Sequence, residues 1–264
     1  MRLSVRHITR YQYELPVQRA ALRLKLYPPR FEAQTPGAWA VTVNGAPVAP
    51  LFTNGLGEGE SIWTSGEPQS AIEIVAEGVV DVSDAAGLVR GLSDQARPAV
   101  FLRQTPLTAP NAAIKALASA MAGEAPLPAL HKLSNAVRDS VDYITAATGH
   151  ATTAAEALAQ GAGVCQDHAH IFIAAARAVG VPARYVSGYL APDYEGLHET
   201  HAWAEAFVPD LGWVGFDPSN RQSPTDAYIR LCAGFDAADA APVRGAVSMG
   251  GGEALDVQVE VAQQ

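Results

Sequence analysis

The first hundred or so residues alternate between hydrophobic and polar positions in short runs, a pattern typical of half-buried β-strands. Residues 39–43 alternate in this way and lead directly into Asn44 and Gly45, a pair that favours the tight turn of a β-hairpin. Residues 71–82 alternate again, and Gly78 inside this run is a candidate β-bulge. Frequent proline and glycine between the runs indicate short strands joined by turns.

Further along the chain the hydrophobic positions follow the period of a helix. Alanine-rich segments predict helices over residues 112–121 and 131–141, the second of them starting after a break at Pro128. Thr153 and Glu156 have the spacing of a capping box, in which each side chain bonds to a backbone N–H near the other residue. This spacing predicts a short helix that begins just after Thr153.

A longer apolar helix is predicted over residues 164–179, with Gly180 directly after it as a stop signal. The pattern then becomes that of strands, and residues 209–212 (Pro-Asp-Leu-Gly) have the composition of a tight turn. A final alternating segment, residues 254–262, is a candidate strand that returns to a sheet formed earlier in the chain. The other strands predicted in this part cover residues 184–190, 202–208 and 213–216.

These patterns predict an α+β protein of two domains. A β-rich N-terminal domain is expected over residues 1–105, followed by an α+β domain over residues 106–264. With 48% hydrophobic and 17% charged residues, a chain of 264 residues can bury the cores that such domains need.

The charge and the cysteine content restrict the partners and the compartment. A net charge of −9 argues against a nucleic-acid partner, because phosphate backbones select clustered Lys and Arg. Two cysteines in a chain of this size favour a reducing compartment, and Cys232 is most simply a buried apolar residue. The first residues lack the apolar core of a signal peptide, and no run approaches ~18 apolar residues. We therefore expect a cytoplasmic protein with no membrane partner, and the sequence leaves its oligomeric state open.

The sharpest chemical signal is a cysteine at the start of the predicted helix 164–179. A loop of small residues runs from Gly161 to Cys165 and brings the cysteine into the first helical turn. Unpaired N–H groups and the helix dipole at such a position favour the thiolate, which is the nucleophilic form. The same N–H groups are available to stabilise an oxyanion. A lone cysteine among apolar residues is more often a small buried side chain, so a catalytic role requires partners.

A histidine and an aspartate downstream have the positions that such partners need. His201 opens one predicted strand and Asp217 follows the next, with the turn at 209–212 between the two strands. An antiparallel hairpin would bring His201 and Asp217 to the same end, opposite or one diagonal apart. The carboxylate would then orient the imidazole, which would deprotonate Cys165 and later protonate the leaving group.

Three segments of the chain resemble the bacterial transglutaminase-like proteins, a group related to papain-type enzymes. They contain the cysteine helix, the His/Asp hairpin and the C-terminal alternating run, and they cover residues 152–190, 200–220 and 241–261. The opening segment, residues 2–17, is similar to the N-terminal β region of the same group. The resemblance implies a papain-like catalytic domain with Cys165 as nucleophile, His201 as base and Asp217 as orienting acid.

We expect acyl transfer through a thioester on Cys165, without a metal or an organic cofactor. The expected substrate is a peptide or another amide or ester. Water as the acceptor gives a peptidase or amidase, and an amine gives cross-linking or transamidation. A thioester donor, as in arylamine acetyltransferases, fits the same Cys-His-Asp order, and the sequence leaves the choice open.

Five other residues near the proposed triad are weaker candidates. Tyr143 and Thr152 are alternatives for a second oxyanion donor, and Gln166 directly after the cysteine is a candidate for contact with substrate. Trp203 shares the strand face of the histidine, so it fits either a cover for the imidazole or a core side chain. Asp167 is most simply a cap for free N–H groups of the helix.

Two rival functions are weaker than the enzyme. Cys165 and His168 together with His198 and His201 offer four zinc ligands, but the two pairs are too far apart for a zinc finger. A zinc site would also leave Asp217 without a role. The second rival is a non-enzymatic binding or scaffold protein on the same fold, which would have little reason to keep all three chemical groups.

Overall fold

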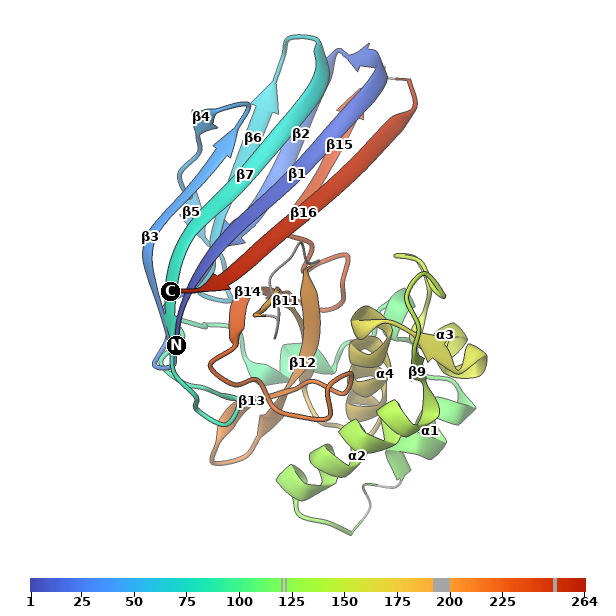
Figure 1. Cartoon of the computed structure of the whole chain (residues 1–264). Helices are drawn as coiled ribbons and strands as arrows, with labels where there is room; N and C mark the ends of the chain where they lie inside the picture. The colour runs from blue at the N-terminus through green and yellow to red at the C-terminus, as the bar shows by residue number, and fades with distance from the viewer. Residues whose placement is uncertain (120, 122, 192–199, 249–250) are drawn as a thin grey trace.

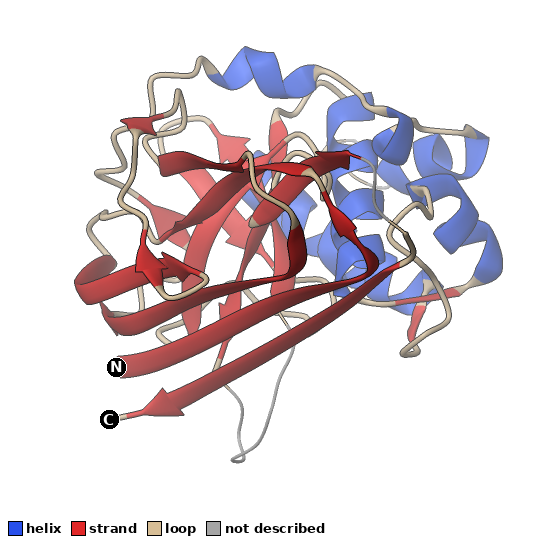
Figure 2. Ribbon diagram, turned by 90° about the horizontal axis from the view of Figure 1, so that it is seen from above, coloured by secondary structure: helices blue, strands red, loops and turns tan. Residues whose placement is uncertain are grey.

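The computed structural model describes residues 1–119, 121, 123–191, 200–248 and 251–264. These residues form a sandwich of two sheets beside a second body, in which a further sheet packs against a group of helices (Figures 1 and 2). The predicted α+β class is therefore confirmed.

Both sheets of the sandwich are antiparallel and share one hydrophobic core, to which Leu3, Leu24 and Ile72 contribute fully buried side chains. The first sheet consists, in spatial order, of β16 (Glu253–Gln263), β1 (Arg2–Val17), β7 (Gln69–Val82), β3 (Gln34–Val43) and β4 (Ala46–Pro47). The second sheet consists of β15 (Val243–Ser248), β2 (Arg19–Tyr27), β6 (Gly59–Ser65) and β5 (Phe52–Thr53).

The second body is built on an antiparallel sheet that we call the central sheet. It consists, in spatial order, of β14 (Tyr228–Gly234), β11 (Ala183–Leu190), β12 (His201–Val208), β13 (Gly212–Phe216) and β8 (Leu88–Val89). The alanines of β12 at positions 202, 204 and 206 are buried in one core with the apolar residues of the helices. Small side chains on this face let a helix approach the sheet closely.

The helix that covers this face is α4 (Cys165–Ala178), which packs on β11 and β12. The other helices are α1 (Ala112–Ser119), α2 (Pro126–Ser140) and α3 (Ala154–Gln160), with short 3₁₀ turns η1 (Pro98–Leu102) and η2 (Pro106–Thr108) and a small parallel pair β9 (Asp142–Tyr143) and β10 (Ala162–Gly163). Within the described part of the chain, no helix is both long and apolar enough to cross a bilayer.

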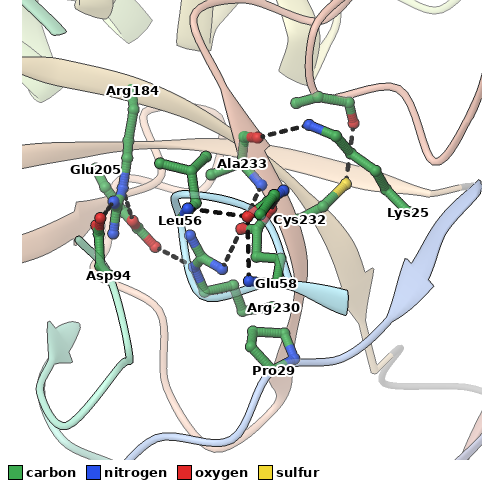
Figure 3. Close-up of polar contacts among 12 residues, drawn as sticks. Lys25, Pro29, Leu56, Glu58, Asp94, Arg184, Glu205, Arg230, Cys232 and Ala233 are labelled. Carbon is green, nitrogen blue, oxygen red and sulfur yellow. Dashed lines mark hydrogen bonds and ion pairs between the residues drawn. The ribbon is translucent and has the colours of Figure 1, made fainter. Parts of the chain in front are cut away.

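Buried charged residues join the sandwich to the central sheet (Figure 3). Glu58, which precedes β6, accepts a hydrogen bond from Arg230 Nη1 at 2.7 Å, and Arg230 Nε donates to Glu205 Oε1 at 2.9 Å. Arg184 Nε donates to the other oxygen of Glu205 at 2.6 Å, and Arg184 also pairs with Asp94. Because these guanidinium and carboxylate groups neutralise one another, all of them tolerate burial.

The helix predictions hold, with one exception. The structure places α4 at Cys165–Ala178 where the pattern predicts residues 164–179, and it confirms the Thr153 capping box at the start of α3. The exception is α2, which begins at Pro126, so the predicted break at Pro128 is wrong. N–H groups of a first helical turn have no intrahelical acceptor, and proline is therefore tolerated there.

The predicted bulge at Gly78 is also wrong. Gly78 pairs in regular register with Val5 of β1, and the irregularity lies in the neighbouring strand β3, between Pro36 and Trp39. A Cβ at Gly78 would lie 2.8 Å from the Cα of Trp39. Glycine is needed at this position because the adjacent backbone comes close, which the sequence of β7 alone does not reveal.

The sequence suggests a domain boundary at residue 105, but strands on each side of this residue pair with strands from the other side. β8 lies before residue 105 and pairs with β13 of the central sheet. At the other end of the chain, β15 pairs with β2 and β16 pairs with β1. The sandwich therefore contains strands from both ends of the chain, and the two termini lie close together (Figure 1).

Candidate active site

Cys165 is the first residue of α4 and is half-buried. The chain is held in place here by Asp167, whose Oδ2 accepts hydrogen bonds from the Val164 backbone N–H at 2.8 Å and from the Thr148 hydroxyl at 2.5 Å. Gly163 leaves room for this carboxylate, because a Cβ there would lie 2.8 Å from the Asp167 side chain. The expected capping role of Asp167 is confirmed, and it fixes the direction in which the chain approaches Cys165.

The structure brings His201 and Asp217 together at one end of the β12–β13 hairpin. His201 is the first residue of β12, and Asp217 directly follows β13. The register pairs Ala204 with Phe216, which places Asp217 one diagonal from His201, as the hairpin predicts. The distance from His201 Nε2 to Asp217 Oδ2 is 2.7 Å.

Asp217 is fully buried and accepts several hydrogen bonds. Asn220 donates to Oδ2 from its side chain at 2.7 Å and to Oδ1 from its backbone N–H at 3.3 Å. The hydroxyl of Tyr228 donates to Oδ2 at 2.8 Å. Burial alone would raise the pKa of Asp217, but hydrogen bonds from His201, Asn220 and Tyr228 hold this pKa below its usual range.

His201 is held as an imidazolium by its neighbours. Burial alone would lower the pKa of His201, but interactions with the side chains of Asp217 and Cys165 raise it to about 10. Since Nε2 is bonded to Asp217, Nδ1 is the ring nitrogen that remains for the sulfur of Cys165. The three residues that the sequence singles out are thus in contact, although they come from α4, β12 and the segment after β13.

Trp203 lies beside the imidazole. Its ring stacks on that of His201 with centroids 6.2 Å apart and an interplanar angle of 28°, and it is 2% exposed. Gly188 of β11 is paired with His201, and a Cβ at Gly188 would lie 2.5 Å from the Trp203 indole. Of the two interpretations of Trp203, cover and core residue, the structure therefore fits both.

The remaining candidates lie around the loop that precedes α3. Tyr143 is exposed and its ring stacks on that of His168, with centroids 6.1 Å apart. The Thr152 hydroxyl accepts a hydrogen bond from the Gly149 N–H at 3.0 Å, and Gln166 Nε2 reaches the His150 carbonyl at 3.5 Å. Thr152 and Gln166 are thus engaged within this loop region, near the first turn of α4.

Three polar residues around Asp217 are absent from the sequence-based set. Asn220 follows Asp217 by three residues, a spacing typical of an aspartate that bonds to its own turn, so a local signal for it exists. Gln222 donates to the Tyr228 hydroxyl at 2.8 Å. Tyr228 is brought to the site by β14, and its contact with Asp217 depends on the order of strands in the central sheet.

The geometry disfavours the zinc alternative. His198, one of its four ligands, lies outside the described residues. His168 is fully buried, and its ring nitrogens lie 2.9 Å from the Val164 carbonyl and 3.0 Å from the Val141 carbonyl. Among the residues that the structure describes, no cluster of three His, Cys, Asp or Glu side chains has a metal-binding arrangement.

Comparison with known proteins agrees with this fold. A family model of the transglutaminase-like superfamily matches residues 115–218, and a model of the bacterial transglutaminase-like N-terminal region matches residues 3–81. An uncharacterised protein of Mycobacterium tuberculosis (strain ATCC 25618 / H37Rv) is 31% identical over 289 residues, which cover 98% of this chain and 92% of that protein.

Two further matches are informative. The crystal structure of a candidate cysteine protease from Cytophaga hutchinsonii has a TM-score of 0.76 at 23% identity, covering 99% of this chain and 90% of that chain, so the two share a fold. A protein-glutamine gamma-glutamyltransferase of Pseudomonas aeruginosa is 36% identical over 70 residues, which are 24% of this chain and 10% of that protein. The predicted transglutaminase-like fold with a β-rich N-terminal region is confirmed. The chain belongs to the transglutaminase-like superfamily and carries the bacterial transglutaminase-like N-terminal region ahead of the superfamily core.

Proposed function

We propose that the protein is an acyl-transfer enzyme with Cys165 as nucleophile, His201 as proton carrier and Asp217 as orienting carboxylate. The observation that carries the proposal is the position of His201, whose Nε2 is hydrogen-bonded to Asp217 and whose pKa is raised by both Asp217 and Cys165. A protonated imidazole beside the sulfur stabilises the negative charge of a thiolate, the form that attacks carbonyl carbon.

The first half of the reaction forms a thioester. The sulfur attacks the carbonyl carbon of an amide or ester, the C–S bond forms, and the carbonyl electron pair moves onto oxygen. When the tetrahedral intermediate collapses, the bond to the leaving group breaks and His201 gives its proton to the departing amine or alcohol. Cys165 then carries the acyl group, and His201 is neutral.

The second half returns the enzyme to its starting state. Water or an amine attacks the thioester carbonyl while His201 removes a proton from it, and the C–S bond breaks to release the thiolate. Asp217 keeps the imidazole in the required orientation throughout and stabilises its charged form. Water as acceptor makes the protein a peptidase or amidase, whereas an amine makes it a transamidase.

The start of α4 supplies donors for the oxyanion. N–H groups in the first turn of a helix are free of intrahelical bonds, and the Cys165 N–H is closest in the chain to the attacking sulfur. Tyr143, Thr152 and Gln166 remain the candidates for a second donor. The partial match to a protein-glutamine gamma-glutamyltransferase supports an amide as the acyl donor.

Trapping of the acyl-enzyme tests this function. The full chain would be incubated with libraries of peptides, simple amides and esters, and intact mass spectrometry would detect a covalent acyl group. We expect the adduct on Cys165, and its loss together with all turnover in Cys165→Ala. Cys232→Ala is the matched control, because Cys232 is a fully buried thiol away from the site, and this variant should keep the adduct.

Turnover by a folded Cys165→Ala variant would contradict the mechanism. Alkylation by iodoacetamide separates the enzyme from a scaffold without any knowledge of the substrate. In the enzyme, Cys165 reacts faster at neutral pH than a free thiol, and His201→Ala removes this advantage. A rate equal to that of a free thiol across the whole pH range would favour the scaffold.

A further inference from the structure

The Tyr228 hydroxyl is well placed to act on the His201–Asp217 pair. We infer that Tyr228 is a positioning residue, which holds Asp217 by a hydrogen bond and holds the imidazole by aromatic packing. The inference rests on the proposed function for its catalytic meaning, but the geometry on which it is based does not depend on any substrate.

The direction of the hydrogen bonds follows from the groups involved. Tyr228 lies 2.8 Å from Asp217 Oδ2 and 2.8 Å from Gln222 Nε2. An ionised carboxylate can only accept, so the single hydroxyl proton must point to Asp217. The tyrosine oxygen then accepts from the Gln222 amide, and the chain of donors runs from Gln222 through Tyr228 to Asp217.

The Tyr228 ring contacts both aromatic rings around the catalytic pair. It meets the His201 ring with centroids 5.8 Å apart at 62°, and the Trp203 ring with centroids 5.6 Å apart at 89°. Trp203 in turn stacks on His201. These three rings therefore fix one another, and Tyr228 adds the hydrogen bond that ties this group to Asp217.

The Tyr228 hydroxyl should have a measurable effect on the protonation of Asp217. In the described part of the chain, the titratable groups that face Asp217 are His201 on β12 and Tyr228 on β14, while Cys165 on α4 faces the imidazole. A hydrogen bond to the carboxylate stabilises it against protonation, and the Tyr228 bond is among those that lower the pKa of Asp217. A side chain that only filled space would leave this pKa unchanged.

Tyr228→Phe isolates the hydroxyl, because the ring contacts with His201 and Trp203 are kept. We expect the midpoint of Asp217 protonation, followed by carbon NMR of the carboxyl group in the full chain, to move about one pH unit upward, a tenfold gain in proton affinity. The acidic limb of the pH profile of kcat/KM should move in the same direction. Gln222→Leu, which removes the donor behind the hydroxyl, should give a smaller shift of the same sign.

Tyr189→Phe is the matched control. Tyr189 is also buried and its hydroxyl lies 2.9 Å from His7 Nδ1, so this variant loses a buried hydrogen bond that does not involve Asp217. It should lose stability without moving the Asp217 midpoint. If Tyr228→Phe also leaves the Asp217 midpoint in place, the positioning role is wrong. If Tyr228→Phe fails to fold, Gln222→Leu decides instead, and an unchanged Asp217 midpoint in that variant contradicts the role. The NMR titration needs no substrate, so it decides this role even if no acyl-enzyme forms.

Discussion

His201 and Asp217 show how a charged pair persists in a buried site. Burial disfavours the charged form of each, yet the pKa of His201 is raised to about 10 and that of Asp217 is lowered. Each shift has the other residue as a main cause, together with the sulfur of Cys165 for the imidazole and Asn220 and Tyr228 for the carboxylate. The charges therefore depend on one another, and removing one partner changes the state of the other.

The pH dependence of stability follows from these two shifts. A histidine whose pKa rises from 6.5 to about 10 on folding stabilises the native state below pH 6.5, and this contribution is lost as pH rises toward 10. Asp217, whose pKa is lowered from 3.8, contributes above pH 3.8 and loses its contribution as pH falls further. The unfolding free energy, measured in urea from pH 3 to 10, should therefore decline at both ends of this range. In Asp217→Asn we expect both declines to be smaller. Equal declines in the variant and the parent would mean that the pair is not charged.

The sequence is informative about residues that have a local signal. Cys165, His201 and Asp217 each occupy the end of an element that the hydrophobic pattern predicts, and the short turn at residues 209–212 brings the last two together. Tyr228 has no such signal, because its approach to Asp217 requires β14 to pair with β11 rather than with a neighbour in sequence. Long-range strand order is set by packing, and local patterns do not encode it.

At the scale of elements, α4 shows how the start of a helix holds the proposed nucleophile. The Asp167 carboxylate turns back to the Val164 N–H, so it accepts from one of the backbone donors at the start of the helix. Its negative charge near the helix N-terminus also interacts favourably with the helix dipole. The capping group therefore both stabilises the helix and fixes the backbone that carries the proposed nucleophile.

Asp167→Ala should reduce both stability and reactivity. Loss of a cap usually costs about 0.5–2 kcal/mol of unfolding free energy, and the Thr148 hydroxyl loses its acceptor as well. We expect a lower midpoint of urea unfolding with an unchanged slope, and slower alkylation of Cys165 under conditions where the variant is folded. Glu156→Ala, which removes the exposed cap partner at the start of α3, is the comparison: it should lower stability but keep the rate of alkylation. Slower alkylation in this control to the same degree would show that the effect is not specific to α4.

Elements that are buried on both faces are hard to predict from the sequence. All residues of β14 (Tyr228–Gly234) are buried, so the strand lacks the alternation by which β16 is recognised, and Arg230 in its middle suggests a surface position. The surrounding fold explains this arginine, since Glu58 and Glu205 neutralise it. Only the tertiary structure supplies those partners.

At the scale of the whole molecule, the N-terminal region is part of the support for the site. Glu58 comes from the sandwich, while Glu205 lies on β12, the strand that begins with His201 (Figure 3). Arg230 joins the two carboxylates. A disturbance of this junction therefore acts on the strand that carries the imidazole, even though the junction makes no contact with substrate in the proposed mechanism.

The two glutamates of the junction should differ in their cost of removal. Arg230 and Arg184 overcome the burial of Glu205 and hold its pKa below its usual range, whereas burial raises the pKa of Glu58 despite Arg230 and Lys25. When a carboxylate is strongly stabilised in its charged form, its replacement by a neutral amide removes more of the folded protein's stability. We expect Glu205→Gln to destabilise the protein by about 3–5 kcal/mol, as for broken buried ion pairs, and Glu58→Gln to cost clearly less.

A surface pair provides the scale for this comparison. Arg6 and Glu77 lie 3.3 Å apart with both side chains about half exposed, so Glu77→Gln should change the unfolding free energy by only about 0–1 kcal/mol. Urea unfolding of the three variants in parallel measures their unfolding free energies. We expect the lowest value for Glu205→Gln, a higher one for Glu58→Gln and the highest for Glu77→Gln. If Glu58→Gln proved as costly as Glu205→Gln, the upward shift of the Glu58 pKa would not weaken its ion pair with Arg230. The ion pair that joins the sandwich to Arg230 would then contribute as much to stability as the pair between Arg230 and Glu205 within the central sheet.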